Sequence, residues 1–127
     1  MATPTVPESH AALLETPVAL ATVNPDGHPQ ITAVVVKLDA DGRLHTSINT
    51  ARQKYKNLVV RPQATVFAID PTNPYRTLEI RADAELLPDP GKAWSTAFLP
   101  GLDLDAIDGD ADRLQVVLTP VKVNALG

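Results

Sequence analysis

Frequent prolines and tight-turn signals constrain the fold of this chain more than any other feature of its sequence. Twelve of the 127 residues are proline, which is tolerated in turns and at element ends but not inside helices or central strands. Residues 24–27 read Asn-Pro-Asp-Gly and residues 39–42 read Asp-Ala-Asp-Gly. Both are typical of tight turns between antiparallel strands. The chain is therefore predicted to form many short strands joined by hairpins rather than long helices.

Residue patterning between the turns predicts the individual elements. The length suits one domain, so 1–127 is expected to be a single domain that opens with a helix and arm over 1–16. Largely apolar or alternating segments between the turns predict six strands, at 18–23, 28–37, 43–49, 64–70, 75–86 and 113–123. Helices are expected at 8–15 (capped by Ser9), 51–60 and 92–98, and a mobile acidic loop at 100–112. A mostly antiparallel sheet of this size closes most economically into a small barrel, because closure removes exposed edges.

The segment 44–58 carries the clearest functional signal. Its first six residues alternate as a strand, and Thr50 is then placed to cap a helix. Arg52, Lys54 and Lys56 bring three cations into the first two turns, where the helix dipole already disfavours positive charge. Free amides and cations at one helix end suit a bound anion such as a phosphate. The alternative interpretation is a solvated basic helix.

Composition excludes several classes of protein. The net charge of −4 argues against nucleic acid as the main partner, because such binding needs extended positive surface. The chain has no cysteine, which excludes thiolate chemistry and fits a cytoplasmic protein. No apolar run approaches the ~20 residues of a membrane span, and the N-terminus lacks the pattern of a signal peptide. Three scattered histidines and acidic residues without calcium-loop spacing lead us to expect no metal site.

Four segments together resemble the pyridoxamine 5'-phosphate oxidase-like split-barrel superfamily. They are the opening hairpin at 19–32, the strand and helix at 44–62, the segment at 73–82 and the closing strand at 119–125. The Arg-x-Lys-x-x-Asn-Leu pattern that starts at Arg52 and the compact C-terminus are most similar to the branch that uses the deazaflavin coenzyme F420. The resemblance covers residues 18–127.

The resemblance implies a mainly β fold, a six-stranded split β-barrel, and a homodimer with cofactor sites in the subunit interface. It implies an oxidoreductase that uses F420 for hydride transfer to or from a small organic substrate, while the protein binds and orients the cofactor. The positions that match cofactor-binding residues of the family are Gln30, Thr32, Ala33, Val34, Thr46, Ser47, Ile48, Asn49, Thr50, Arg52, Lys54, Asn57 and Arg76. Tyr75 is the candidate proton donor, with solvent as the alternative.

Other functions on the same barrel stay open. FMN-binding members of the superfamily are also similar to this chain, so an FMN-binding oxidoreductase is one alternative, and a non-enzymatic protein that only carries flavin or haem is another. A haem protein would need an axial ligand, for which His28 and His45 are the candidates in the barrel. The chain lacks the arginine-led strand and the C-terminal tail of the oxidase proper, since 31–36 reads Ile-Thr-Ala-Val-Val-Val. Oxidation of vitamin B6 is therefore not expected.

Overall fold

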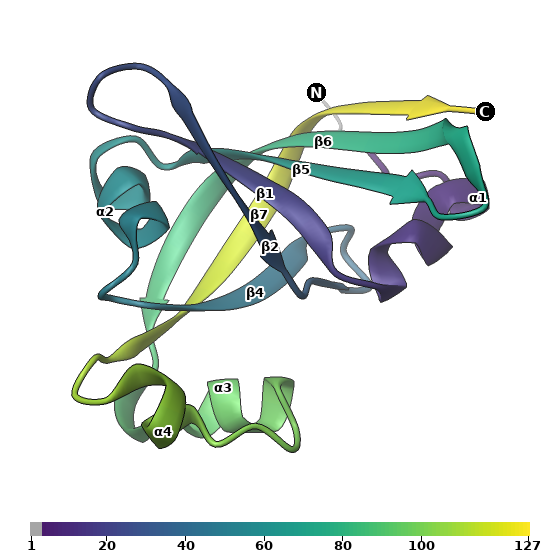
Figure 1. Ribbon diagram of the computed structural model, residues 1–127. Helices are drawn as coiled ribbons and strands as arrows, with labels where there is room; N and C mark the ends of the chain where they lie inside the picture. The colour runs from purple at the N-terminus through teal and green to yellow at the C-terminus, as the bar shows by residue number, and fades with distance from the viewer. Residues whose placement is uncertain (1–3) are drawn as a thin grey trace.

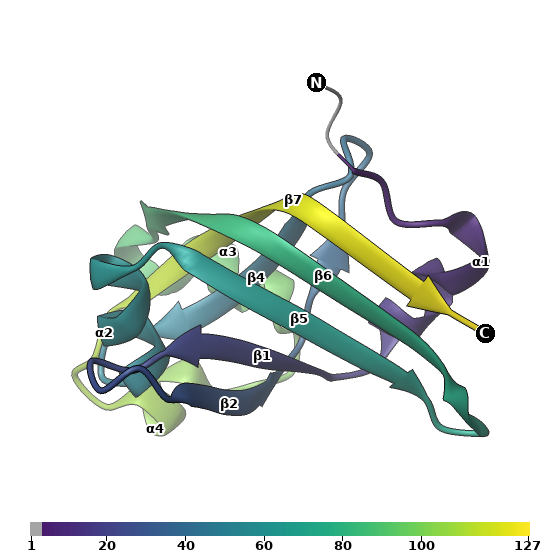
Figure 2. The same ribbon diagram turned by 90° about the horizontal axis from the view of Figure 1, so that it is seen from above.

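A curled antiparallel sheet dominates the computed structural model, which describes residues 4–127 (Figures 1 and 2). The strands pair in the order β2-β1-β5-β6-β7-β4-β3. They are β1 (Val18–Val23), β2 (Pro29–Val34), β3 (Lys37–Leu38), β4 (Leu44–Asn49), β5 (Gln63–Asp70), β6 (Asn73–Pro88) and β7 (Arg113–Leu126). Sheet curvature encloses a core of buried aliphatic side chains, with Leu44, Leu78 and Ile80 fully buried. The predicted mainly β split barrel is confirmed.

Local turn chemistry sets both predicted hairpins. Gly27 and Gly42 have φ of 88° and 83°, values that glycine adopts without the steric cost of a Cβ. The Asn24 amide donates to the His28 carbonyl oxygen at 2.9 Å, and the Asp39 amide donates to the Arg43 carbonyl oxygen at 2.8 Å. These bonds join β1 to β2 and β3 to β4, as the sequence predicts.

The prediction of a single strand at 28–37 is wrong. This segment contributes to two strands, which lie at opposite ends of the sheet. β2 pairs with β1, whereas β3 pairs with β4. The chain crosses from one end to the other through Val35 and Val36, and the Thr46 hydroxyl holds this crossing by donating to the Val35 carbonyl oxygen at 2.7 Å. An unbroken Ile-Thr-Ala-Val-Val-Val run offers no turn signal, so periodicity alone extends one strand through the crossing. The sheet therefore has seven strands rather than six.

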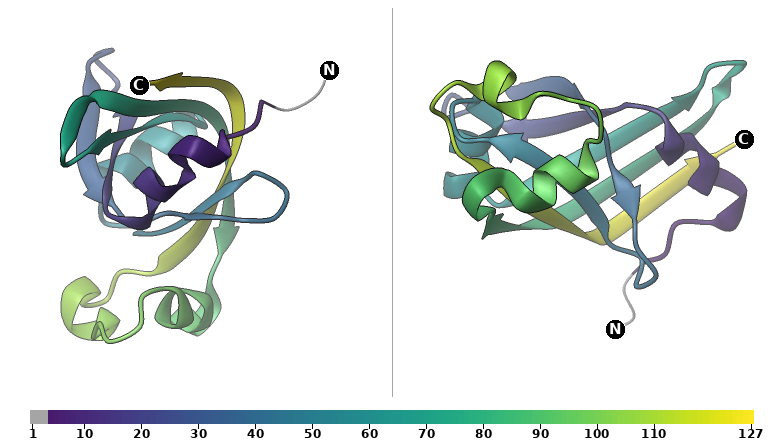
Figure 3. Two further views of the ribbon diagram at one scale, coloured as in Figure 1. Left: turned by 90° about the vertical axis from the view of Figure 1, so that its right-hand side faces the viewer. Right: turned by 90° about the horizontal axis from the view of Figure 1, so that it is seen from below.

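Two short helical segments cover the open ends of the barrel (Figure 3). The N-terminal segment is α1 (Glu8–Ala11) followed by a 3₁₀ turn (Ala12–Glu15), and it buries Leu13 and Leu14. At the other end α2 (Gln53–Val60) buries Leu58 in the same core. None of the helices in residues 4–127 is long and apolar enough to cross a bilayer.

Neither predicted helix cap is present. Pro7 precedes α1 and Ser9 lies inside it, bonded to the His10 ring. At α2 the N-cap position is Arg52, without a side-chain bond, so this helix begins two residues later than predicted. The Thr50 amide instead donates to the Asp112 carbonyl oxygen at 2.9 Å, because the pairing of β4 with β7, which ends at Asn49 and Arg113, brings Asp112 beside it.

The predicted mobile acidic loop at 100–112 is wrong. The chain between β6 and β7 forms α3 (Ala93–Phe98) and α4 (Leu104–Asp108), which lie outside the barrel (Figure 1). The Asp103 carboxylate caps α4 by accepting a bond from the Ala106 amide at 3.1 Å. A five-residue helix that buries one leucine has too few apolar positions to show helical periodicity.

Candidate functional site

A cavity of about 580 Å³ lies where β2 and β4, from opposite ends of the curled sheet, approach the start of α2. Most of the predicted cofactor-binding residues line it, namely Gln30, Thr32, Ala33, Val34, Thr46, Ser47, Ile48, Asn49, Arg52 and Lys54. The curl of the sheet thus brings β2 to the same concave site as β4 and the start of α2. That these residues bind a cofactor remains a prediction.

Sequence patterning did not point to four other residues that line the cavity. These are Val35, Gln53, Leu99 and Arg113. Val35 and Gln53 adjoin predicted residues in sequence, so the same motifs could have included them. Leu99 follows α3 and Arg113 begins β7, and no local pattern reveals that the chain after β6 returns to this cavity.

Two cations beside α2 give the cavity its positive charge. The Lys54 ammonium donates to the Thr32 hydroxyl oxygen, with 3.2 Å between Nζ and Oγ1. Within residues 4–127, neither Arg52 nor Lys54 forms an ion pair with a carboxylate. Burial lowers the pKa of Lys54, and the charges of Arg52 and Arg113 lower it further. The charged amine therefore lacks the partner that would stabilise it, which a bound anion would supply.

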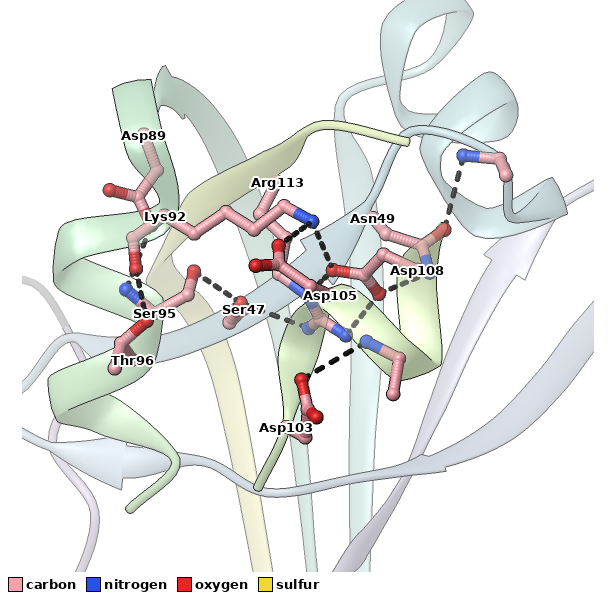
Figure 4. A network of polar contacts seen from close by, with 12 residues as sticks. Ser47, Asn49, Asp89, Lys92, Ser95, Thr96, Asp103, Asp105, Asp108 and Arg113 are labelled. Carbon is pink, nitrogen blue, oxygen red and sulfur yellow. Dashed lines mark hydrogen bonds and ion pairs between the residues drawn. The ribbon is translucent and has the colours of Figure 1, made fainter. Parts of the chain in front are cut away.

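A third cation, Arg113, is paired with a buried carboxylate (Figure 4). Its Nε and Nη2 donate to the two oxygens of Asp108, each at 2.8 Å. The Asp108 side chain has no exposed surface, and it also accepts bonds from Asn49 at 3.0 Å and Lys92 at 3.2 Å. The bonds from Arg113 lower the pKa of Asp108 to about 2, against the opposing effect of burial, with Asn49 and Lys92 adding to the shift. This carboxylate therefore stays charged and anchors α4 to the cavity wall.

Ser47 connects the cavity to α3. Arg113 Nη1 donates to the Ser47 hydroxyl at 3.1 Å, and this hydroxyl lies 2.6 Å from that of Ser95. The Ser95 amide in turn donates to the Asp89 carboxylate at 2.8 Å. One polar network thus links β4, β7, α3 and α4 beneath the cavity (Figure 4).

Acid should weaken the fold through Asp108. Its pKa lies lower in the folded chain than the ordinary 3.8, so its stabilising contribution is complete above about pH 4 and disappears as the pH falls toward 2. The shift corresponds to about 2 kcal/mol, of which about 1 kcal/mol should be lost between pH 5 and pH 3. Urea unfolding of the wild type and Asp108→Asn at these pH values measures the difference. Exposed Asp41→Asn should keep the wild-type pH dependence, and equal dependence in Asp108→Asn would contradict the assignment.

Four predicted site residues lie outside the cavity. Thr50 belongs to the connection between β4 and α2, and Asn57 points into the interior between α2 and β1. Tyr75 is 84% exposed near the start of β6. Arg76 pairs with Asp70 at 3.1 Å and donates to the Ser9 carbonyl oxygen, which places it beside α1 at the end of the barrel opposite α2 (Figure 1).

Asn57 holds α2 in place instead. Its side chain is buried, its amide nitrogen donates to the Thr22 hydroxyl and the Asn24 side-chain oxygen at 3.0 Å each, and its oxygen accepts from Gln53 at 2.9 Å. Replacing it with alanine should destabilise the fold by about 2 kcal/mol, because buried Thr22 loses its donor. Urea unfolding measures this, with exposed Lys56→Ala on the same helix as the control. A loss below about 0.5 kcal/mol would show that these bonds are not important for stability.

The three histidines have partners away from the cavity. His45 pairs with Asp39 at 2.6 Å and contacts Gln115 at 3.0 Å, His10 bonds the Leu126 carbonyl oxygen at 2.8 Å, and His28 lies beside Asp26 in the first turn. None of them lines the cavity, and no cluster of metal-ligating side chains occurs in the part of the chain that the structure describes.

Comparison with known proteins places this architecture in a family. The family model of pyridoxamine 5'-phosphate oxidase matches residues 6–126. A solved F420 reductase is 36% identical, with a TM-score of 0.78 over 94% of this chain and 98% of its own. No curated protein sequence matches this chain closely enough to count as a relative.

More distant structures share the fold alone. A pyridoxamine 5'-phosphate oxidase-related, FMN-binding protein from Nostoc punctiforme is 19% identical, with a TM-score of 0.65 over 86% of this chain and 72% of its own. A haem storage protein from Vibrio cholerae is 20% identical, with a TM-score of 0.70 over 98% and 96%. Because the family model spans nearly all of the sequence, the chain belongs to the pyridoxamine 5'-phosphate oxidase family.

Proposed function

We propose that the chain is an oxidoreductase that binds the deazaflavin coenzyme F420 in the cavity between β2, β4 and α2. The observation that carries the proposal is a pair of cations, Arg52 and Lys54, that face this cavity and have no carboxylate partner among residues 4–127. A phosphate group would supply the missing negative charge, and charge-assisted hydrogen bonds are among the strongest polar contacts that proteins make. The likeness to an F420 reductase over nearly the whole of both chains favours the deazaflavin.

The residues of the cavity divide into an anion-binding part and a wall. Arg52 and Lys54 would hold the cofactor phosphate, and Thr32 orients the Lys54 ammonium toward it. Ala33, Val35 and Leu99 line the cavity and keep exposed surface, so they would supply apolar contacts for a flat ring system, whereas Val34 and Ile48 are buried in the core. When bound, the deazaflavin would supply the hydride chemistry. The chain's own contribution is then to bind, to orient and to exclude water.

Protonation of the product needs a donor other than the Tyr75 of the same chain. Tyr75 lies near the start of β6 and does not line the cavity. Solvent is the other donor expected from the sequence, and a second copy could bring its Tyr75 or Arg76 across an interface. The proposal therefore includes assembly of two chains around the cofactor sites.

The outer face of the sheet suits such a homodimer (Figure 2). Ile31 on β2 and Phe67 and Ile69 on β5 are exposed on one face, since strand pairing aligns Ile31 with Ala21 and Ala19 with Phe67. Exposed apolar surface of this kind favours association. Phe67→Lys is expected to shift the protein from dimer to monomer in sedimentation equilibrium, whereas Asp41→Lys should not. A wild-type monomer at all concentrations would refute this part of the proposal.

FMN is the second candidate cofactor. Arg52 and Lys54 could bind the phosphate of either cofactor. The charge of the cavity therefore does not by itself indicate whether the cofactor is a flavin or a deazaflavin. The relation to an FMN-binding structure is too distant to favour FMN over F420. The two cofactors are therefore compared directly.

Titration of the purified protein with F420 and with FMN tests the proposal. The quenching of cofactor fluorescence gives a Kd for each. Tighter binding of F420, followed by turnover with electron-poor organic acceptors, is the expected result. Tighter binding of FMN would move the chain to the flavin-dependent branch, and tight binding without turnover would indicate a carrier. If neither cofactor bound, the proposed function would be wrong.

A further inference from the structure

Arg113 has more hydrogen-bonding capacity than its protein partners use. A guanidinium carries five N–H groups, and among residues 4–127 it makes three bonds, two to Asp108 and one to Ser47. Two N–H groups, one on each terminal nitrogen, are therefore left without a protein partner. The side chain is only 9% exposed and lines the cavity. A charged group that is nine-tenths buried has little access to water, so these donors need an acceptor inside the cavity.

The direction of these free donors is fixed by the contacts that Arg113 already makes. Asp108 holds the Nε and Nη2 edge, and Ser47 holds one N–H of Nη1. The guanidinium is therefore immobilised before any ligand arrives, and little conformational entropy is lost when one binds. Arg113 and Lys54 line the same cavity, and the charge of Arg113 lowers the pKa of Lys54.

We propose that Arg113 is a third anion-contacting residue of the cavity, and that Asp108 is the positioning residue that presents it. The inference rests on the proposed function in that it concerns the same cavity. It names a contact that no sequence motif marks, and it assigns the segment between β6 and β7 a role in binding. Through Asp108 on α4, this segment orients a ligand contact on β7.

Inorganic pyrophosphate is the probe, because it tests the anion site without depending on the ring of the cofactor. Calorimetric titration of the wild type, Arg113→Gln and Arg113→Lys gives the affinities. Loss of two charge-assisted donors should weaken binding about tenfold or more in Arg113→Gln. Arg113→Lys should fall between the two, because it keeps the charge and loses the planar fork. Arg81→Gln, which removes an arginine that pairs with Glu79 outside the cavity, is the matched control.

A double-mutant cycle separates positioning from mere structural support. Asp108→Asn should weaken pyrophosphate binding in the wild-type background and have no further effect on it in Arg113→Gln. Circular dichroism and thermal unfolding without ligand show what fraction of each variant is folded. If Asp108→Asn lowers stability but leaves the affinity of the folded protein unchanged, the positioning role is refuted.

The remaining outcomes distinguish this inference from the proposed function. If pyrophosphate binds through Arg113 but neither F420 nor FMN binds, the inference holds and the proposed function fails. If Arg113→Gln and Arg113→Lys both bind pyrophosphate as the wild type does, the inference fails and the proposed function stands on Arg52 and Lys54. If the wild type does not bind pyrophosphate at millimolar concentration, the anion site itself is refuted.

Discussion

Replacing Asp108 with alanine is expected to lower the free energy of unfolding by about 3–5 kcal/mol, the usual loss when a buried ion pair keeps only one partner. The carboxylate has no exposed surface and accepts bonds from Arg113, Asn49 and Lys92. Its removal leaves the Arg113 guanidinium buried without its counter-charge, and it detaches α4 from β7 and β4. Urea denaturation followed by circular dichroism measures the change.

Asp105→Ala is the matched control for that variant. Asp105 lies on the same helix and bonds the same Lys92 at 3.2 Å, but its side chain is 91% exposed. Water competes for exposed ion pairs, so its loss should change stability by less than about 1 kcal/mol. Similar losses in Asp105→Ala and Asp108→Ala would show that burial of the network does not determine its contribution.

A double substitution of Arg52 and Lys54 by glutamine is expected to weaken F420 or FMN binding about a hundredfold or more. Each charge-assisted contact contributes about 1.5–3 kcal/mol, and about 1.4 kcal/mol corresponds to a tenfold change in Kd. The unliganded protein should not lose stability, because the half-buried Lys54 ammonium lies near the like charges of Arg52 and Arg113 and its removal relieves this repulsion. Fluorescence titration and thermal unfolding give the two quantities on the same sample.

The control is the double variant Lys56→Gln with Arg61→Gln, which removes the same charge from the same end of the barrel. Neither residue lines the cavity. If this variant weakens binding as much as the first one does, the effect is due to general electrostatic attraction and the phosphate assignment is wrong. If only the Arg52 and Lys54 variant loses affinity, the contacts are specific.

Local chemistry determined much of this protein from the sequence by itself. The two glycine turns, the largely apolar strand at 18–23 and the strand-to-helix passage at 44–58 are properties of neighbouring residues, and the structure has all three. The cations Arg52 and Lys54 belong to the same continuous segment, so their gathering at one cavity needed no knowledge of distant contacts. The family resemblance, which rests on four such segments, is confirmed.

Tertiary structure decided what depends on contacts between distant segments. No turn signal marks the break between β2 and β3. The two strands are separated because β2 pairs with β1 and β3 pairs with β4, and local backbone preference does not determine this pairing. Asn57 is used for packing because α2 lies against β1, and α4 is ordered because Asp108 finds Arg113 and Asn49 inside the protein. Side-chain periodicity reports which residues share a face, but it does not report which partner a buried polar group meets across the barrel.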